Sequence, residues 1–182
     1  VTIMQATFRS ATSFNGDISQ WDTSSVTTMY RMFRGATLFD GDVSQWDTSS
    51  VTTSQGMFTS AGSFNNDVSQ WDTSSVTTMQ STFYDATSFN RDVSQWDISS
   101  VTTTEYMFYG ASSFDQDLCW DLTDVTTTDM FGGSSGTADC LPTPLPTPWP
   151  TPPSFNDSTL SGAVDEWLSD GATAEVKYGH IS

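Results

Sequence analysis

The chain has 182 residues, room for one or two domains, and its five Lys and Arg against 22 Asp and Glu give a net charge of −17. That charge argues against nucleic-acid binding, because a phosphate polyanion would be repelled. Aromatic residues make up 13% of the chain, which argues against disorder. No apolar run approaches the roughly 18 residues typical of a membrane span. The chain starts at Val1 with no signal peptide, so we expect a mature portion of a longer protein.

An internal repeat of 25 residues dominates residues 1 to 131. Its clearest marker is a tryptophan that returns every 25 residues, the last copy coming one residue early: Trp21, Trp46, Trp71, Trp96 and Trp120. A phenylalanine column accompanies it at Phe33, Phe58, Phe83 and Phe108. A unit this short cannot bury its own apolar face, so we expect the copies to stack around a core of these Trp and Phe side chains.

The apolar pattern within one copy predicts how the chain winds. Apolar residues return once per winding and are expected to point inward, in the first copy Ile18, Trp21, Val26, Met29, Phe33, Ala36 and Phe39. Residues 19–23 have strand-type character and precede a Ser-Ser turn signal, while residues 29–36 are compatible with one or two helical turns. We therefore predict a solenoid, a right-handed coil with one short parallel strand and one helical or irregular segment per winding.

The recurring phrase Phe-Asn-x-Asp-Ile/Val-Ser-Gln-Trp-Asp-Thr-Ser-Ser-Val-Thr-Thr-Met-x-x-Met-Phe carries a family resemblance. It resembles the roughly 26-residue repeat of bacterial-type surface proteins, the BspA-like group of leucine-rich repeats. The resemblance implies a leucine-rich-repeat-like fold and an extracellular surface or adhesive role. The chain departs from the phrase at Ser54 and Thr104, where other copies have Met, and again over residues 119–124. We interpret the last copy as a cap.

Three segments follow from this organisation. Residues 1–140 are expected to form the repeat solenoid with its C-terminal cap. All seven prolines lie between Pro142 and Pro153, which predicts a polyproline II linker over residues 141–153. Residues 154–182 show helical spacing around Trp167 and end in Ile181-Ser182, matching Ile18-Ser19. This segment is predicted to be the N-terminal cap helix of a following repeat solenoid.

Two columns of aspartates run through the repeats. The first comprises Asp17, Asp42, Asp67, Asp92 and Asp117, and the second follows each Trp, beginning with Asp22. Carboxylates about 5 Å apart repel by about 0.8 kcal/mol even in water, so something must offset the repulsion. Each Asp could cap local N–H groups, as in an Asx-turn from Asp22 to Ser24, or the first column could bridge Ca²⁺. No EF-hand or nonapeptide calcium motif occurs, so we favour capping and expect no cofactor, with structural Ca²⁺ as the alternative.

Other repeated side chains suggest binding rather than catalysis. The Trp column is either core packing, which we favour, or a stacking platform for sugars. The Thr27-Thr28 columns match either simple strand propensity, which we favour, or an ice-binding lattice. His180 is the single histidine, no catalytic motif is present, and the carboxylates repeat identically, so we expect no enzyme and no catalytic residue.

Three covalent features are expected in a surface protein of this kind. Two cysteines, Cys119 and Cys140, predict a disulfide that fastens the cap. Asn156 begins an N-glycosylation sequon, with a plain helix cap as its alternative reading. Threonines alternate with proline in the linker, which predicts O-glycosylation at Thr143, Thr147 and Thr151.

These expectations describe an extracellular or cell-surface structural protein, a component of a filament or surface layer built from tandem solenoid units. The alternative is a surface adhesin or carbohydrate-binding module. The expected partners are covalently attached glycans and further copies of the chain, with no nucleic acid and no membrane span. In the repeat frame, the gap between Ile181-Ser182 and Val1 is the six residues of Gln20 to Ser25, which predicts a tandem polymer joined head to tail.

Overall fold

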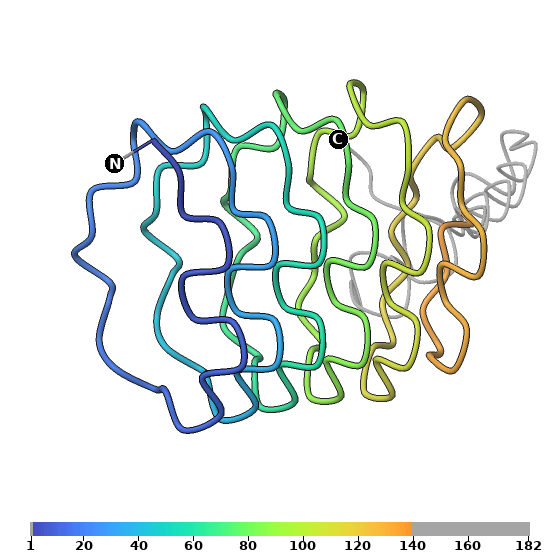
Figure 1. Ribbon diagram of the computed structural model, residues 1–182. Coiled ribbons are helices and arrows are strands. Elements are labelled where there is room, and N and C mark those ends of the chain that lie inside the picture. Colours follow the sequence, from blue (N-terminus) through green and yellow to red (C-terminus); the bar gives the residue numbers. More distant parts are fainter. Residues whose placement is uncertain (1, 140–182) are drawn as a thin grey trace, which may run out of the picture. The chain divides into compact units, whose positions relative to one another are not determined.

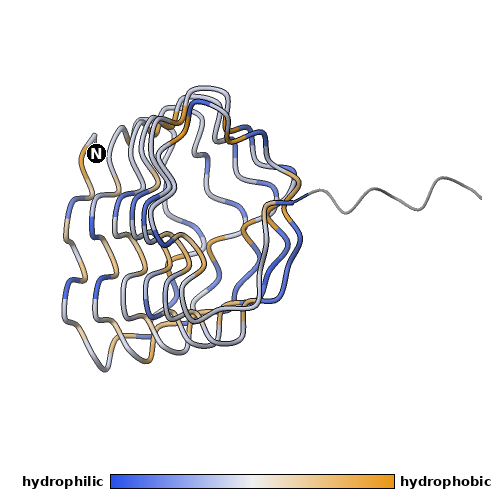
Figure 2. Ribbon diagram, turned by 90° about the vertical axis from the view of Figure 1, so that its right-hand side faces the viewer, coloured by the Kyte–Doolittle hydropathy of each residue, from blue (hydrophilic) through white to orange (hydrophobic). Residues whose placement is uncertain are grey.

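The computed structural model describes residues 2–139, which lie within one compact unit, Val1–Leu141. The backbone winds repeatedly, and successive windings lie side by side in chain order (Figure 1). We call each winding a rung; the rungs span residues 3–27, 28–52, 53–77, 78–102 and 103–125, and a partial rung follows. In Figure 2 the rungs follow nearly the same path, and polar and apolar positions recur from one rung to the next. The 25-residue period of the sequence is therefore the period of the stack.

The rungs are joined by isolated parallel bridges and not by strands. One residue per rung takes part, in the order Ile3, Thr28, Thr53, Thr78, Thr103 and Thr126. A further bridge pairs Asp117 with Thr137. Between residues 2 and 139 there is no helix and no extended strand. The predicted solenoid with a strand and a helical segment in each winding is therefore wrong. Where the strand was expected, residues 19 and 20 lie in a turn and residues 21–23 are irregular.

Backbone hydrogen bonding explains why residues 29–36 form no helix. The N–H groups of Arg31, Phe33 and Gly35 donate to carbonyls of the next rung, at 3.0, 2.8 and 2.7 Å. The N–H groups between them donate three residues back within the rung, as Arg34 does to Arg31 at 3.2 Å. Arg31 and Gly35 have φ of 54° and 72°, and a right-handed helix cannot pass through left-handed residues. The segment is a series of tight turns whose remaining donors bond across the stack.

The bridges stay one residue long for a related reason. On one side of Thr28, the N–H of Thr27 donates to Thr2 of the preceding rung, and on the other side Met29 donates forward to Thr53. The chain turns immediately afterwards, so extended pairing has no room to continue. Neighbouring rungs nevertheless satisfy one another's backbone groups along much of each winding, as a sheet would.

Two phenylalanine columns form the centre of the core. The first includes Phe33 and Phe58, whose ring centroids lie 5.4 Å apart in parallel planes. The second includes Phe64 and Phe89, which are 6.0 Å apart. Within a rung the columns touch, as in Phe58 and Phe64 at 3.8 Å. Each ring thus packs against aromatic neighbours within its own rung and in adjacent rungs, an arrangement that only a stack of equivalent windings can provide.

The predicted inward positions of the first copy are confirmed, with one exception. Ile18, Val26, Met29, Phe33, Ala36 and Phe39 are all buried, as are their equivalents up to Leu118, whereas Val125 and Phe131 near the end of the described stack are half-buried. The exception is Trp21, which is 39% exposed, whereas Trp46 is 4% exposed. The difference arises because Trp46 lies against a preceding rung and Trp21 belongs to the first described one.

The last rungs depart from the common period. Thr126 follows Thr103 by 23 residues, so two residues are missing relative to a full rung. One deletion precedes Trp120 and the other lies between Val125 and Met130. As a result, Thr126 both accepts from the N–H of Thr104 at 2.8 Å and donates to Thr102 at 3.0 Å. In a complete rung, two successive threonines share these contacts, as Thr52 and Thr53 do.

Several predictions concern residues outside the described range. These are the polyproline linker at 141–153, the cap helix in 154–182, and the partner cysteine Cys140.

Candidate functional site

The second aspartate column forms a line of Asx-turns. As predicted, the N–H of Ser24 donates to Oδ1 of Asp22, at 3.1 Å, and the Ser24 hydroxyl donates to the same oxygen at 2.6 Å. The same pair of bonds recurs at Asp47 and Asp72. The side-chain and backbone hydrogen bonds from Ser74 lower the pKa of Asp72, against smaller opposing effects from desolvation and from neighbouring carboxylates. Local capping therefore outweighs repulsion along this column.

The first column is capped in the same way over most of its length. The N–H groups of Ser19, Ser44, Ser69 and Ser94 donate to the Asp two residues earlier, at 2.9 to 3.0 Å. Asp117, the last member, instead takes part in the bridge to Thr137. Among residues 2–139, no group of three or more His, Cys, Asp or Glu side chains could hold a metal ion. The calcium alternative at Asp17, Asp42, Asp67, Asp92 and Asp117 thus has no multidentate site in this part of the chain.

A third polar column was not predicted. The residue after each second-column Phe is Asn or Asp, and its Oδ1 accepts the N–H of the equivalent residue one rung later. The bonds join Asn15 to Asp40, Asp40 to Asn65, Asn65 to Asn90 and Asn90 to Asp115, at 2.9 to 3.0 Å. The sequence signal was available as Phe-Asn or Phe-Asp in each copy. The sequence alone does not show that the Oδ1 atom accepts a backbone N–H of the next rung and not one of its own rung.

The threonine hydroxyls also form hydrogen bonds within the stack. The hydroxyls of Thr52, Thr77 and Thr102 donate to the carbonyl of the equivalent Thr one rung earlier, at 3.0 to 3.1 Å. The hydroxyls of Thr28 and Thr53 accept N–H groups two residues later. These contacts favour the structural reading of the threonines over an ice-binding lattice, because the exposed column's hydroxyl protons point along the stack.

The tryptophan column packs within the stack. The indole N–H of Trp46, Trp71 and Trp96 donates to a carbonyl 28 residues earlier, at 3.1, 3.0 and 2.9 Å. Trp71 and Trp96 also stack on each other with centroids 6.2 Å apart. From Trp46 onward the indoles are buried, so their faces are not available as a platform for sugars.

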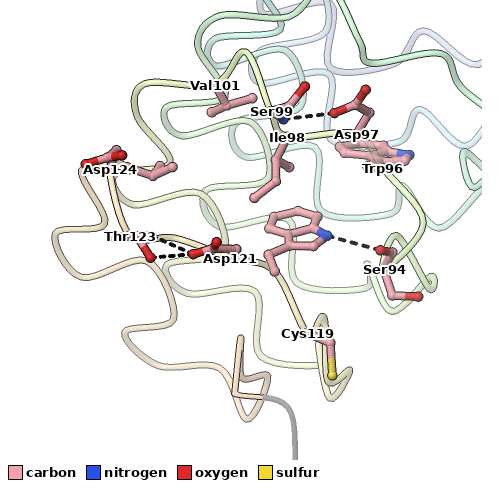
Figure 3. A pocket seen from close by; sticks show the side chains of 12 residues that line it. Ser94, Trp96, Asp97, Ile98, Ser99, Val101, Cys119, Asp121, Thr123 and Asp124 are labelled. Atoms are coloured by element: carbon pink, nitrogen blue, oxygen red, sulfur yellow. Dashed lines mark hydrogen bonds between the residues drawn. The ribbon is translucent and has the colours of Figure 1, made fainter.

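A hollow of about 510 Å³ opens where the repeat shortens (Figure 3). The indole N–H of Trp120 donates to Ser94, 26 residues earlier, at 3.2 Å, and not to a residue 28 positions earlier as in the other rungs. The lining includes Asp97, Asp121 and Asp124 together with Ile98. Figure 3 shows Asp97 and Asp121 each held by its own turn, through Ser99 and Thr123.

The carboxylates of this hollow do not form an acid/base pair. Hydrogen bonds from the Ser99 side chain and backbone lower the pKa of Asp97, and those from Thr123 lower the pKa of Asp121. General acid/base chemistry needs two groups whose pKa values are driven apart, and here both shift in the same direction for the same reason. The hollow offers carboxylate acceptors beside apolar walls, which suits binding of hydroxyl groups better than proton transfer.

Of the predicted covalent sites, only Cys119 lies within the described residues. Cys119 lies at the exposed edge of the hollow, with φ of 51°, and its proposed partner Cys140 is outside the described residues. The glycosylation candidates Asn156, Thr143, Thr147 and Thr151 are also outside them. The disulfide and the glycans stay predictions. Between residues 2 and 139, the structure contains no helix long and apolar enough to cross a bilayer.

These features define a repeat protein of stacked 25-residue rungs held together by backbone, Asn/Asp and Trp hydrogen bonds between rungs. The family model described as "Mycoplasma protein of unknown function, DUF285" matches residues 1–71 and 42–141, and the chain belongs to this family. No curated protein and no solved structure matches the chain.

The family match corrects the resemblance to BspA-like leucine-rich-repeat surface proteins. The matched family is a different one, and the rungs lack the strand and helical segments that a leucine-rich repeat would have. The repeat phrase was real, but its assignment to the leucine-rich-repeat class was wrong. Shared spacing of apolar residues is not specific to one backbone conformation.

Proposed function

We propose that this protein is a non-catalytic structural component of an extracellular filament or surface layer, assembled by stacking copies head to tail. The observation that carries the proposal is that the same kinds of contact join one rung to the next: backbone hydrogen bonds, an Asn or Asp Oδ1 and parallel aromatic rings. Among the described residues, Ile3 and Trp21 are 61% and 39% exposed and line, with Met4, a hollow of about 530 Å³. In later rungs the tryptophans equivalent to Trp21 are buried, at Trp46, Trp71 and Trp96.

The chemistry of the rungs supports stacking between copies. Each full-length rung offers the next one backbone acceptors, an Asn or Asp Oδ1 and parallel aromatic rings. A rung from a second copy would meet the same donors and rings as a covalently linked one. Such a contact joins two different surfaces of the same protein. It gives a closed ring only if the rotation between neighbouring copies closes a circle, and otherwise it gives an open filament.

Sedimentation velocity of the full chain over a range of concentrations tests this proposal. We expect the sedimentation coefficient to rise with concentration, more strongly in 0.15 M salt than at low salt, because the net charge of −17 opposes association until it is screened. The double variant Ile3→Lys/Trp21→Arg should remain monomeric. Leu38→Lys is the matched control, since Leu38 is 56% exposed but does not line this hollow. A chain that stays monomeric under all conditions would refute the proposal.

A surface adhesin is the second candidate function. It is favoured by the hollow beside Asp97 and Asp121, which offers carboxylate acceptors to a hydroxyl-bearing ligand. Titration with neutral oligosaccharides, followed by the fluorescence of the indoles near Trp120, tests it. Saturable quenching that Asp121→Ala weakens would support this candidate, and an unchanged spectrum at millimolar sugar would count against it.

A further inference from the structure

One face of the stack varies from rung to rung while the rest repeats. The Trp, Asp and Ser positions are identical in the central rungs, as in Trp46, Trp71 and Trp96. On the face formed by the left-handed turns, the equivalent residues differ completely: Arg31, Gly56, Ser81 and Tyr106. Where a side chain packs against the equivalent side chain of the next rung, the residue type must be the same in every rung. On this face the residue type can change from rung to rung. It is where a repeat protein can present a specific set of groups.

The variable face contains a hollow of about 360 Å³, within the size range of ligand pockets, about 300–1,000 Å³. The small residues Gly56 and Ser81 line it, as do Arg31 and Arg34 from the rung before that of Gly56. A Cβ at Gly56 would lie 3.2 Å from Cγ of Arg31, so the absence of a side chain there lets the Arg31 stem lie across the next rung. The hollow therefore depends on one rung being small where its neighbours are large.

Among the described residues, neither of the two arginines has an acidic partner. The chain carries 22 acidic residues and five basic ones, yet within residues 2–139 neither guanidinium forms an ion pair or a side-chain hydrogen bond. Arg31 only lies over the ring of Tyr30, at 4.7 Å from its centroid. Both arginines are half-buried. Two half-buried arginines that line the same hollow, with their side-chain hydrogen-bond donors unused, are suited to a carboxylate from outside the chain.

The remaining lining groups add hydroxyl and ring recognition. Nε2 of Gln55 donates to Oε1 of Gln80 at 2.7 Å, and Nε2 of Gln80 donates to Oε2 of Glu105 at 3.4 Å. This chain of amides orients Gln55 so that its own Oε1 can still accept. Tyr84 also lines the hollow and stacks on Tyr109, with ring centroids 5.1 Å apart. A fixed aromatic ring beside amide groups is a common way to hold a pyranose.

We propose that this hollow binds an acidic saccharide, with the sugar carboxylate on Arg31 and Arg34, its hydroxyls on Gln55 and Gln80, and its ring beside Tyr84. The inference rests on the second candidate function, surface adhesion, and adds to it a site separate from the hollow beside Asp97, with acidic saccharides as its ligand class. It is independent of self-association, because the hollow lies on the variable face and not at the edge of the first rung. A failed titration would leave the sedimentation result unaffected.

Isothermal titration of the full chain with a galacturonic acid tetramer tests the proposal. We expect saturable binding, loss of at least about tenfold in affinity for Arg31→Gln/Arg34→Gln, and a smaller loss for Tyr84→Leu. Arg91→Gln is the matched control, since exposed Arg91 instead donates to the Asn65 carbonyl at 2.6 Å, and its affinity should stay within about twofold. Unchanged thermal melting of each variant shows that the rungs remain stacked.

Two further probes separate the sources of binding. The methyl-esterified tetramer has the same rings without charge, and sodium sulfate has charge without rings. Weak binding of both, with strong binding of the acid tetramer, supports the proposal. Equal binding of the ester, equal binding of sulfate, equal losses for Arg91→Gln and the double variant, or no heat with the acid tetramer at millimolar concentration would each overturn it.

Discussion

The indole Nε1 of Trp71 donates a 3.0 Å hydrogen bond to the backbone carbonyl of Val43, 28 residues earlier and one rung away. Both residues are buried, and the same carbonyl also accepts the backbone N–H of Trp46, at 3.2 Å. The contact ties the tryptophan of one rung to the turn that precedes the tryptophan of the rung before. The indoles of Trp46, Trp71 and Trp96 therefore join neighbouring rungs by a hydrogen bond and also pack in the core.

Replacing Trp71 with Phe is expected to destabilise the stack by about 0.5–1.5 kcal/mol beyond the loss of packing, because one hydrogen bond between rungs is lost while the Val43 carbonyl keeps its bond from the N–H of Trp46. Chemical denaturation followed by far-UV circular dichroism measures the change. Trp21→Phe is the control, since Trp21 is partly exposed and its indole N–H makes no hydrogen bond among the described residues. Equal losses for the two variants would show that the hydrogen bond contributes nothing.

Phe64 lies in the middle of the second aromatic column, between Phe39 at 5.9 Å and Phe89 at 6.0 Å. Phe64→Ala should cost about 3–5 kcal/mol, because a fully buried ring is removed from a stack that cannot close around the cavity. Leu38→Ala, at a position that is 56% exposed, should change stability by less than about 0.5 kcal/mol. A melting temperature for Phe64→Ala equal to that of the parent would contradict the stacked core.

The Asx-turns predict a loss of stability in acid. Hydrogen bonds lower the pKa of Asp22, Asp47, Asp72 and Asp97 in the folded chain, so each contributes stability that is present above its unfolded value, about 3.9. That contribution is lost as the pH falls through the lower folded pKa. We expect the melting temperature to hold between about pH 5 and 8 and to fall below about pH 4.

Two substitutions at Asp72 separate capping from charge. Asp72→Asn keeps an Oδ1 acceptor for the N–H and hydroxyl of Ser74, whereas Asp72→Ala removes it. Both remove the same repulsion from Asp47 and Asp97. We expect the Asn variant to melt close to the parent at pH 7 and the Ala variant to melt lower. The reverse order would mean that relief of repulsion outweighs the turn.

Gly110 has φ of +70°, and a Cβ there would collide with Oδ1 of Asp85 in the preceding rung. Gly110→Ala should therefore destabilise by at least about 1–2 kcal/mol from backbone strain alone. Gly62 is the matched glycine: its φ is ordinary and its added Cβ would meet only Oγ1 of Thr87, at 3.5 Å. Gly62→Ala should be neutral or stabilising by about 0.4–1 kcal/mol. Similar effects at both positions, measured by thermal unfolding, would exclude the left-handed turn as the cause.

The amino-acid sequence by itself determined the period, the inward columns and the Asx-turns. The period is visible because side chains that stack on their own copies must repeat, as Trp46, Trp71 and Trp96 do. The turn at Asp22 was predictable because it depends only on residues two positions apart. Neither inference needed knowledge of how the backbone runs between the columns.

Only the tertiary structure decided the backbone conformation and the candidate sites. The same apolar spacing fits strands, helical turns or tight turns, and the choice was made by hydrogen bonds between rungs, as from Arg31 to Gln55. Left-handed φ at Arg31 and Ser81 was not readable from residue type, because it is the stack that holds these residues there. The hollow under Arg31 and Arg34 likewise exists only because residues 25 positions apart become neighbours. Neighbouring residues in the sequence determine a local turn, whereas the contacts between rungs join residues about 25 positions apart and form only when the rungs stack.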